Sequence, residues 1–512
     1  MEINGAEADL SGLSHAVRQM WGDLLINRDD PRRDRETGNL ASTYIYVRPP
    51  DDGVSELLQP LIELRRREGY NVMEMIDPGS PEWLLQSITE RNEAGSYPVE
   101  YVCLVGDYGG DFSIPTFIHG TSDYPYGLLE GADPLPEAAV GRISYNSIQE
   151  LERIIDKILT YELQPDLDDP DWYRCGAVSA GNPRSGLSTI LVSRWVRDLM
   201  LRHDYAVVDT FWWTMAGGVE NFMTDVFDRG ALFVNYRGWT GMEDWSEREA
   251  LRLVNDHLPV AVLLACNVGD FAGRGYGYTE ALLRSEGGAI GAIGTVGSQS
   301  RVDCNNALMA GYYRGVVEDG VCRLGWTLNR AKLEMFAAYS AVNMERVSDH
   351  AYWTNLMGDP GTVVWRGTPR RVELEMPEVA SIGDGEFTVT VSDEDENPVV
   401  NVRVGLYKED EIVSAAYTND DGEAHLVFGH EDVTQGPGLV TVSGDRVVPR
   451  SEEIAFRLAD RILVYDGYSV ADDAMAPHDG NDDGVPNPHE TIGLTVTSRN
   501  LGEQNIQAGT VF

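Results

Sequence analysis

The sequence predicts an α/β protein with two adjacent doubly wound parallel sheets, followed by β domains. Short apolar runs alternate with helical patterns through two long stretches, as in parallel sheets covered by helices. The run from Pro259 to Ala265 is apolar without interruption, which is typical of a strand buried on both faces. Past Pro369 the apolar residues recur at every second position, which favours antiparallel strands.

The first predicted α/β unit covers residues 41–165 and follows a polar lead-in over residues 1–40. Strands are expected at 44–47, 72–76 and 101–105, with a helix over 54–66 whose leucines recur at helical spacing. Ser147 and Glu150 form a capping-box pattern that predicts the start of another helix.

The second predicted α/β unit covers residues 166–368, after an acidic, proline-containing link. A strand is expected from Cys175, and a helix with apolar residues on one stripe follows over 191–199. Further strands end at Tyr236, Ala265 and Thr295, so residues that follow these ends lie where open α/β folds place their chemistry.

The β region divides into an immunoglobulin-like sandwich over 369–459 and the start of a further β domain over 460–512. The pair Asp421-Gly422 is a hairpin turn signal within the sandwich. Because the last pattern stops at Phe512 in mid-domain, we expect the chain to be a fragment of a longer protein.

The composition is that of a globular protein with an unusual charge. The chain has 512 residues, is 42% hydrophobic and carries a net charge of −43. Only Lys157, Lys332 and Lys408 are lysines, so arginine supplies almost all the positive charge. This acidity disfavours binding to nucleic acid or anionic membranes. It fits a secreted protein or a high-salt habitat, or simply a solvated acidic surface.

Several other classes are disfavoured by the sequence. No stretch is long enough to span a bilayer, and the five cysteines show no metal-ligand spacing. The N-terminus lacks a signal-peptide pattern, so the protein is expected either to stay inside or to begin after a removed leader. The sequence leaves the oligomeric state open.

Cys266 is the residue that bears most directly on function. It ends the apolar run and is followed by Asn267-Val-Gly-Asp-Phe271. A thiol at a strand end can be a nucleophile, and it can also be a buried apolar residue.

Six further patterns give a more specific indication. They are Val102-Cys-Leu-Val-Gly-Asp107, Ser122-Asp-Tyr-Pro-Tyr-Gly127, Glu137-Ala-Ala-Val-Gly-Arg142, Asn235-Tyr-Arg-Gly238, Cys266-Asn-Val-Gly-Asp-Phe271 and His350-Ala-Tyr-Trp353 through Gly358-Asp-Pro360. In this order the chain resembles the gingipain-type cysteine peptidases, family C25 of the caspase-like clan, over roughly residues 40–460. The resemblance implies two caspase-like subdomains, an immunoglobulin-like domain after them, a protein or peptide substrate, and secretion or a cell-surface location.

The resemblance also implies roles for four residues. Cys266 falls at the family's nucleophile, and Glu137 at the acid that orients its catalytic histidine. Trp239 stands at the histidine position, and Thr240 replaces a glycine that helps to form the oxyanion hole. An indole N–H is a donor only, so Trp239 cannot accept a proton and the Cys-His dyad is broken there. Thr240 keeps its backbone N–H but would resist a positive φ.

Other histidines are candidates for a replacement base. His119 precedes Asp123 in a loop that could face the same cleft, and His350 begins an aromatic segment where packing is the more ordinary role. His257 lies nine residues before Cys266, which places it roughly 30 Å away along an extended strand.

Two functions are therefore compared. The first is a C25-type cysteine endopeptidase that keeps its nucleophile but needs a base that the sequence does not show, so activity by the usual Cys-His route is expected to be reduced or absent. The second is a non-catalytic extracellular scaffold for binding or surface assembly. Reactivity of Cys266 toward electrophiles separates them.

A calcium-type loop is predicted near the C-terminus. Asp479-Gly-Asn-Asp-Asp-Gly-Val-Pro-Asn-Pro-His-Glu490 has the spacing of a twelve-residue calcium loop. The expected ligands are Asp479, Asn481, Asp483, the carbonyl of Val485, Asn487 and Glu490. A solvated acidic turn is the alternative, and no organic cofactor is expected.

Overall fold

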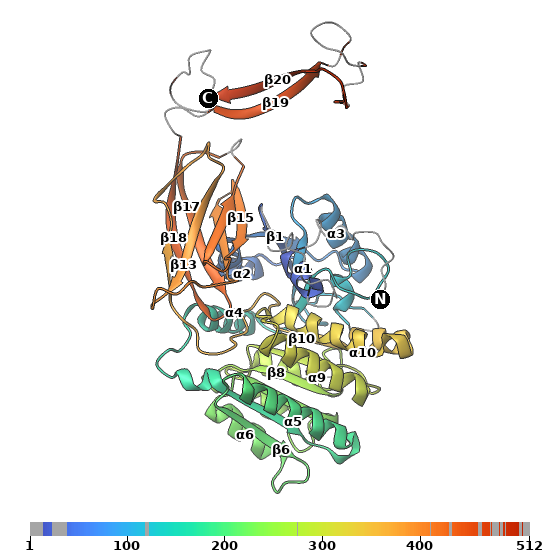
Figure 1. Cartoon of the computed structure of the whole chain (residues 1–512). Helices are drawn as coiled ribbons and strands as arrows, with labels where there is room; N and C mark the ends of the chain where they lie inside the picture. The colour runs from blue at the N-terminus through green and yellow to red at the C-terminus, as the bar shows by residue number, and fades with distance from the viewer. Residues whose placement is uncertain are drawn as a thin grey trace.

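The computed structural model describes most of the chain. It covers residues 14–22, 38–117, 122–273, 275–409, 411–429, 433–458 and 463–471, and then 473, 481, 485–486, 488–500 and 504. The described part consists of an α/β body, a two-sheet β domain and a two-stranded ribbon (Figure 1).

The first α/β unit begins after a short helix, α1 (His15–Gly22). Its elements are β1 (Ser42–Arg48), α2 (Asp52–Arg67), β2 (Tyr70–Ile76), α3 (Pro81–Ala94), β3 (Val99–Val105), the 3₁₀ helix η1 (Tyr124–Gly127), β4 (Ala139–Ile143) and α4 (Ile148–Leu163). The predicted start of α4 is confirmed, because the Ser147 side chain accepts from the Glu150 N–H. The Glu150 carboxylate accepts from Asn146, one residue before the expected partner.

The second α/β unit follows the same alternation. Its elements are η2 (Pro170–Arg174), β5 (Cys175–Ala180), η3 (Pro183–Ser185), α5 (Leu187–Arg202), β6 (Val207–Trp212), α6 (Val219–Arg229), β7 (Phe233–Thr240), α7 (Glu247–Leu251), β8 (Val260–Cys266), α8 (Tyr278–Arg284), β9 (Gly291–Thr295), α9 (Val302–Val317), α10 (Leu324–Trp353) and β10 (Thr354–Met357). Helices α5, α9 and α10 lie side by side over one face of the sheet (Figure 1).

The two units share one ten-stranded sheet, in the order β2-β1-β3-β4-β10-β9-β8-β7-β5-β6. Strand β10 joins them, since it runs parallel to β4 and antiparallel to β9. The parallel strands of the two units therefore run in opposite directions. As a result, β4 begins at the same sheet edge at which β7, β8 and β9 end.

The β region folds as two facing sheets around one apolar core. Its strands are β11 (Val372–Glu375), β12 (Val379–Ser381), β13 (Glu386–Asp393), β14 (Arg403–Lys408), β15 (Ile412–Tyr417), β16 (Glu423–Val427), β17 (Gly436–Gly444) and β18 (Val447–Arg457). A ribbon of β19 (Leu463–Ala471) and β20 (Gly493–Asn500) extends beyond it (Figure 1).

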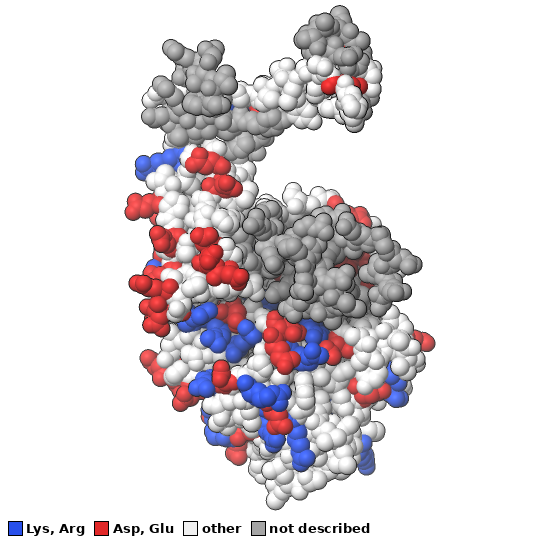
Figure 2. All heavy atoms as spheres, in the orientation of Figure 1, with Lys and Arg blue, Asp and Glu red and all other residues white. Residues whose placement is uncertain are grey.

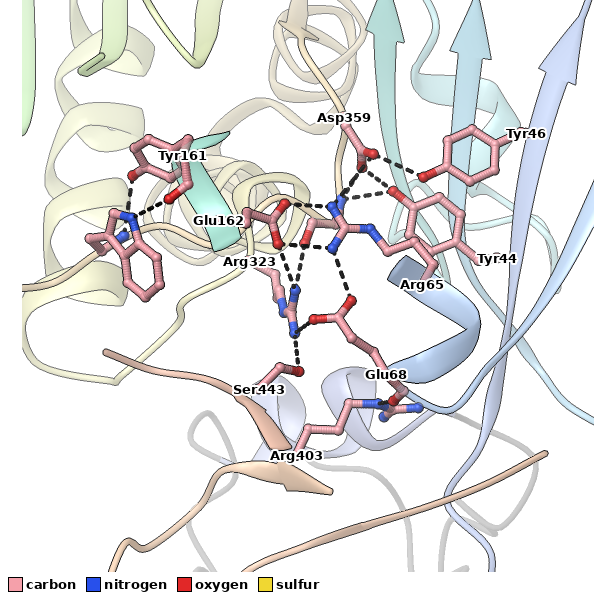
Figure 3. Close-up of polar contacts among 12 residues, drawn as sticks. Tyr44, Tyr46, Arg65, Glu68, Tyr161, Glu162, Arg323, Asp359, Arg403 and Ser443 are labelled. Atoms are coloured by element: carbon pink, nitrogen blue, oxygen red, sulfur yellow. Dashed lines mark hydrogen bonds and ion pairs between the residues drawn. The ribbon is translucent and has the colours of Figure 1, made fainter. Parts of the chain in front are cut away.

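A buried ionic network joins the α/β body to the β domain (Figure 3). Arg65 of α2 pairs with Glu162 of α4 at 2.6 Å and with Glu68 at 2.9 Å. Arg323 pairs with Glu68 at 3.0 Å and donates to the Ser443 hydroxyl of β17 at 3.1 Å. The network thus has members from both α/β units and from the β domain.

Close backbone packing supports the same interface. A side chain on Gly405 of β14 would come within 2.3 Å of the Glu68 backbone. Arg403, also on β14, donates to the carbonyls of Glu68 and Gly69 and stacks 4.0 Å over the Tyr70 ring. The β domain therefore docks through specific contacts rather than through a loose linker.

Charge is unevenly distributed on the visible face. Figure 2 shows mostly acidic side chains along the β domain, whereas basic and acidic side chains are mixed on the α/β body. The three lysines are all buried, so the exposed cations of the described residues are arginines.

Candidate active site

Cys266 is the last residue of β8 and lies at the carboxyl edge of the second unit. Every residue of β8 is buried, as the uninterrupted apolar pattern predicts. The Cys266 side chain is 7% exposed, so its sulfur lies close under the surface. The sulfur is 3.2 Å from the Ser300 hydroxyl and 3.9 Å from the Ser300 carbonyl.

Trp239 and Thr240 end the neighbouring strand, β7. The ladder between β7 and β8 shifts register after Arg237 and resumes where Thr240 faces Cys266. Trp239 is therefore one residue from the strand partner of Cys266, and its indole is 42% exposed. The structure brings Trp239, Thr240 and Cys266 together, as the order of their strands predicts.

The turns after β7 and β8 contain residues in the left-handed backbone conformation, but Thr240 is not one of them. Gly241 has φ +62° and donates its N–H to the Cys266 carbonyl at 2.9 Å, and Asn267 has φ +62°. Asparagine and glycine are the residues that tolerate this conformation. Thr240 does not have a positive φ, so its β-branched side chain causes no strain here.

Glu137 lies at the same edge, just before β4. Two strands, β10 and β9, separate β4 from β8 in the sheet order. The Glu137 carboxylate accepts from the N–H groups of Leu129 and Glu130, at 2.8 and 3.2 Å. Burial raises the pKa of Glu137 to about 7, against the effect of these two N–H groups. The carboxylate is thus held by the loop before it.

The three candidate histidines differ in position. His257 pairs with Asp169 at 3.6 Å and stacks on Trp172, ahead of the extended β8 and therefore away from Cys266. His119 lies outside the described residues. His350 is fully buried in the second half of α10, and burial lowers its pKa to about 3.

A row of polar side chains leads from Cys266 to His350. Asn305 of α9 donates its amide N–H to the Ser300 hydroxyl at 3.3 Å, and His350 Nε2 lies 2.8 Å from the Asn305 amide oxygen. No sequence motif marks Ser300 or Asn305. The one signal for them is their position just after the strand that ends at Thr295, because this strand ends at the same sheet edge as β8 and Cys266.

Arg237 of β7 is buried beside this row. Its guanidinium donates to the carbonyls of Leu264 and Val302 and to the Asn306 amide oxygen. Within the described residues no carboxylate lies in ion-pair range of Arg237.

Half of the predicted calcium ligands lie outside the described residues, namely Asp479, Asp483 and Asn487. Asn481, Val485 and Glu490 are described, at or near the surface. The described residues include no group of three His, Cys, Asp or Glu side chains that could hold a metal ion. In the same residues, no helix has the length and apolar character needed to cross a membrane.

The Cys266 thiol at the carboxyl edge of a parallel sheet, next to the end of a second strand, lies where open α/β folds place their chemistry, and it suits an α/β enzyme with a cysteine nucleophile. The chain belongs to peptidase family C25, whose family pattern matches residues 40–365. The resemblance inferred from the sequence is confirmed by this match.

Similar individual proteins support the assignment to this family. Gingipain R1 of Porphyromonas gingivalis is 25% identical over 417 residues, which cover 76% of this chain and 40% of the relative. Gingipain R2 of the same species is 25% identical over 408 residues, covering 74% of this chain and 53% of the relative. The chain thus spans about half or less of the length of these relatives.

Solved structures agree on the fold. The crystal structure of the Arg-specific cysteine proteinase gingipain R has a TM-score of 0.70 at 19% identity, covering 83% of this chain and 99% of that one. A complex of gingipain pro- and mature domains from P. gingivalis has a TM-score of 0.70 at 20% identity, covering 81% and 100%. The expected caspase-like α/β fold is therefore confirmed.

Proposed function

We propose that this chain is a C25 peptidase homologue that keeps its nucleophile, Cys266, but has reduced or no peptidase activity by the usual Cys-His route. The observation that supports this most is Trp239, which lies one residue from the strand partner of Cys266. An indole cannot take a proton from the thiol or return one to a leaving amine. His350, the buried candidate, stays neutral and does not touch the sulfur.

Hydrolysis of peptide amides tests the proposal. We expect the full chain to cleave a mixture of fluorogenic peptides no faster than its Cys266→Ala variant. Cys266-dependent turnover at rates typical of proteases, between about 1 and 10³ per second, would contradict it. Because the sequence predicts a calcium loop over residues 479–490, the assay is also run with calcium present.

A binding scaffold is the second candidate, and the exposed indole favours it. Large aromatic side chains at the surface are common anchors for protein ligands. The ligand would be a protein or peptide held at the edge formed by β7 and β8. Peptide titrations followed by tryptophan fluorescence should show saturable binding to the wild type and a lower affinity for Trp239→Ala. Equal affinities would show that the peptide does not bind at the edge formed by β7 and β8.

We also infer that the loop over 479–490 binds calcium and that the protein acts outside the cell or at its surface. Oxygen ligands at this spacing suit calcium, and millimolar calcium is an extracellular condition. The facing-sheet β domain is consistent with an immunoglobulin-like domain, as the family resemblance implies.

Thermal unfolding with and without calcium tests whether the loop over 479–490 binds the ion. We expect added calcium to raise the thermal unfolding midpoint, since a ligand bound only by the folded state stabilises it. The variant Asp479→Ala should lose this effect. Asp420→Asn, in an acidic turn of the β domain, serves as the matched control, and equal calcium responses in both variants would exclude the loop.

A further inference from the structure

We propose that the Ser300 hydroxyl, oriented by Asn305 and His350, holds the sulfur of Cys266 as a thiolate, with the buried guanidinium of Arg237 as its counter-charge. This inference deepens the proposed function, on which it rests, by giving the retained nucleophile a support that does not require a histidine at position 239.

The Asn305 amide sets the direction of the hydrogen bonds between His350 and Ser300. The Asn305 amide oxygen can only accept, so His350 must donate its Nε2–H across the 2.8 Å contact. The same amide donates its N–H to the Ser300 oxygen at 3.3 Å. The hydroxyl proton of Ser300 is then available for the Cys266 sulfur at 3.2 Å. With Ser300 as the donor, every donor in the row points toward the sulfur and favours its negative form, whereas a neutral thiol would itself donate to the Ser300 hydroxyl or carbonyl.

His350 donates to Asn305 as a neutral imidazole. Its ring is fully buried, and its pKa is lowered to about 3 by burial first and by the Arg237 charge second. With the proton on Nε2, the Nδ1 atom is the acceptor, and no partner for it is found among the described residues. His350 is therefore a positioning residue and not a base.

Arg237 supplies positive charge near the end of β8, because its guanidinium donates to the carbonyl of Leu264, two residues before Cys266. Burial lowers the pKa of Arg237 to about 9, while a negative charge on Tyr236 or Cys266 would raise it. The guanidinium is therefore charged at neutral pH. Its three acceptors are neutral carbonyl and amide oxygens, and within the described part of the chain no carboxylate pairs with it, so a Cys266 thiolate would supply the missing negative charge.

The other charges around the row come from the loop before α9 and from α9 and α10. Asp303 pairs with Arg301 at 3.6 Å and with Arg346 at 3.4 Å. This cluster of two arginines and one aspartate has a formal charge of +1 and acts on His350. Arg237 is the buried cation on β7, the strand paired with β8, and it donates to the Leu264 carbonyl of β8.

The thiolate would react with electrophiles even where amide hydrolysis fails. With iodoacetamide, the thiol proton leaves to solvent, the sulfur forms a bond to carbon, and the carbon–iodine bond breaks to release iodide. No proton donor is needed for that leaving group. A peptide amine, in contrast, must be protonated as it leaves, and Trp239 cannot do this.

Alkylation of Cys266 by iodoacetamide between pH 5 and 10 tests whether this row of hydrogen bonds stabilises a thiolate. Peptide mass spectrometry locates the labelled residue. We expect half-maximal labelling of the wild type well below about 8.5, the value of a free thiol. Ser300→Ala should move the profile upward by roughly one pH unit, about a tenfold loss of rate at neutral pH, as expected for a lost hydrogen bond to a charged group.

Three further variants sharpen the test. Asn305→Asp keeps the shape of the side chain but cannot donate to Ser300, so it should shift the profile in the same direction. Arg237→Gln should do so as well. Ser298→Ala, an exposed position in the same loop, is the matched control and should leave the profile unchanged. Thermal unfolding checks each fold, and the Ser300 and Asn305 variants decide the question if Arg237→Gln does not fold.

Two results would overturn the proposal that these side chains stabilise a Cys266 thiolate. One is a wild-type profile no different from that of a model thiol, and the other is a coincidence of the Ser300→Ala, Asn305→Asp and wild-type profiles. Alkylation does not depend on amide turnover, so Cys266-dependent peptide hydrolysis at rates typical of proteases would refute the proposed function while leaving the labelling result intact.

Discussion

At the residue scale, position 239 decides whether the thiol can be part of a dyad. Thr240 and Cys266 are strand partners, so a side chain at 239 stands at the rim of the same site. We expect Trp239→His, combined with Thr240→Gly, to introduce Cys266-dependent peptide hydrolysis. General acid–base catalysis is worth at least about a hundredfold, which sets the size of the gain over wild type.

The control for this gain is Trp239→Phe, which removes the indole without adding a base. Fluorogenic peptide assays of both variants, each with and without Cys266→Ala, separate a restored dyad from a site that has only been opened. Equal rates for the histidine and phenylalanine variants would mean that the loss of histidine is not what limits the chemistry.

Glu137 gives a second residue-scale prediction, concerning stability and pH. Burial raises its folded-state pKa from 4.5 to about 7, so the folded chain binds more protons than the unfolded chain between these values. Its contribution to stability is therefore fully present below pH 4.5 and is lost as the pH rises through 7. After allowance for solvent screening of a half-buried group, the loss is on the order of 1 kcal/mol.

Glu137→Gln isolates this contribution. Urea unfolding of wild type and variant at intervals from pH 4.5 to 8 should show a flatter profile for the variant. Glu280, whose pKa is also raised to about 7 by burial, titrates in both proteins and cancels in the difference. Parallel profiles would mean that Glu137 is ionised throughout this range.

At the element scale, α10 is two helical segments joined at Asn343. This residue is not helical, with φ −162° and ψ 91°, and its side-chain oxygen accepts from the Arg346 N–H at 3.0 Å. Asn343 thus caps the segment that carries His350. We expect Asn343→Ala to lower the free energy of unfolding by roughly 1 kcal/mol and Asn343→Asp, which can still cap, to lower it much less. Chemical denaturation compares them, and equal losses would argue against a capping role.

Elements also show what the sequence could predict. The β8 strand and its cysteine were predictable, because a strand buried on both faces leaves an uninterrupted apolar run. Strand β10 was not, since four residues are too few to show a period, yet it reverses the direction of half the sheet. That reversal brings the start of β4, and with it Glu137, to the edge where β8 ends.

The supporting side chains of the site were harder still to predict. Ser300 and Asn305 are ordinary polar residues in a loop and a helical first turn, and their alignment depends on where α9 and α10 pack. The family motifs located Cys266 and position 239, whereas only the folded arrangement of three separate segments reveals the hydrogen-bonded row beneath them.

At the scale of the whole molecule, the buried ions bind the α/β body and the β domain into one unit. Burial opposes ionisation of Glu68, but the charges of Arg323 and Arg65 outweigh this effect and hold its pKa at about 2. Arg323 also reaches Ser443 of β17. A single side chain therefore neutralises a buried acid of one domain and contacts the other domain.

Arg323→Met is the change that tests this arrangement. It leaves Glu68 buried with one of its two cations gone, and breaking a buried pair in this way costs about 3–5 kcal/mol. Adding Glu68→Gln should recover part of the loss, because the uncompensated charge is then removed. Arg67→Gln breaks an exposed pair with Glu63 and should cost at most about 0.5 kcal/mol. If Arg323→Met costs no more than this control in urea unfolding, solvent reaches the network and the two domains are held together by packing alone.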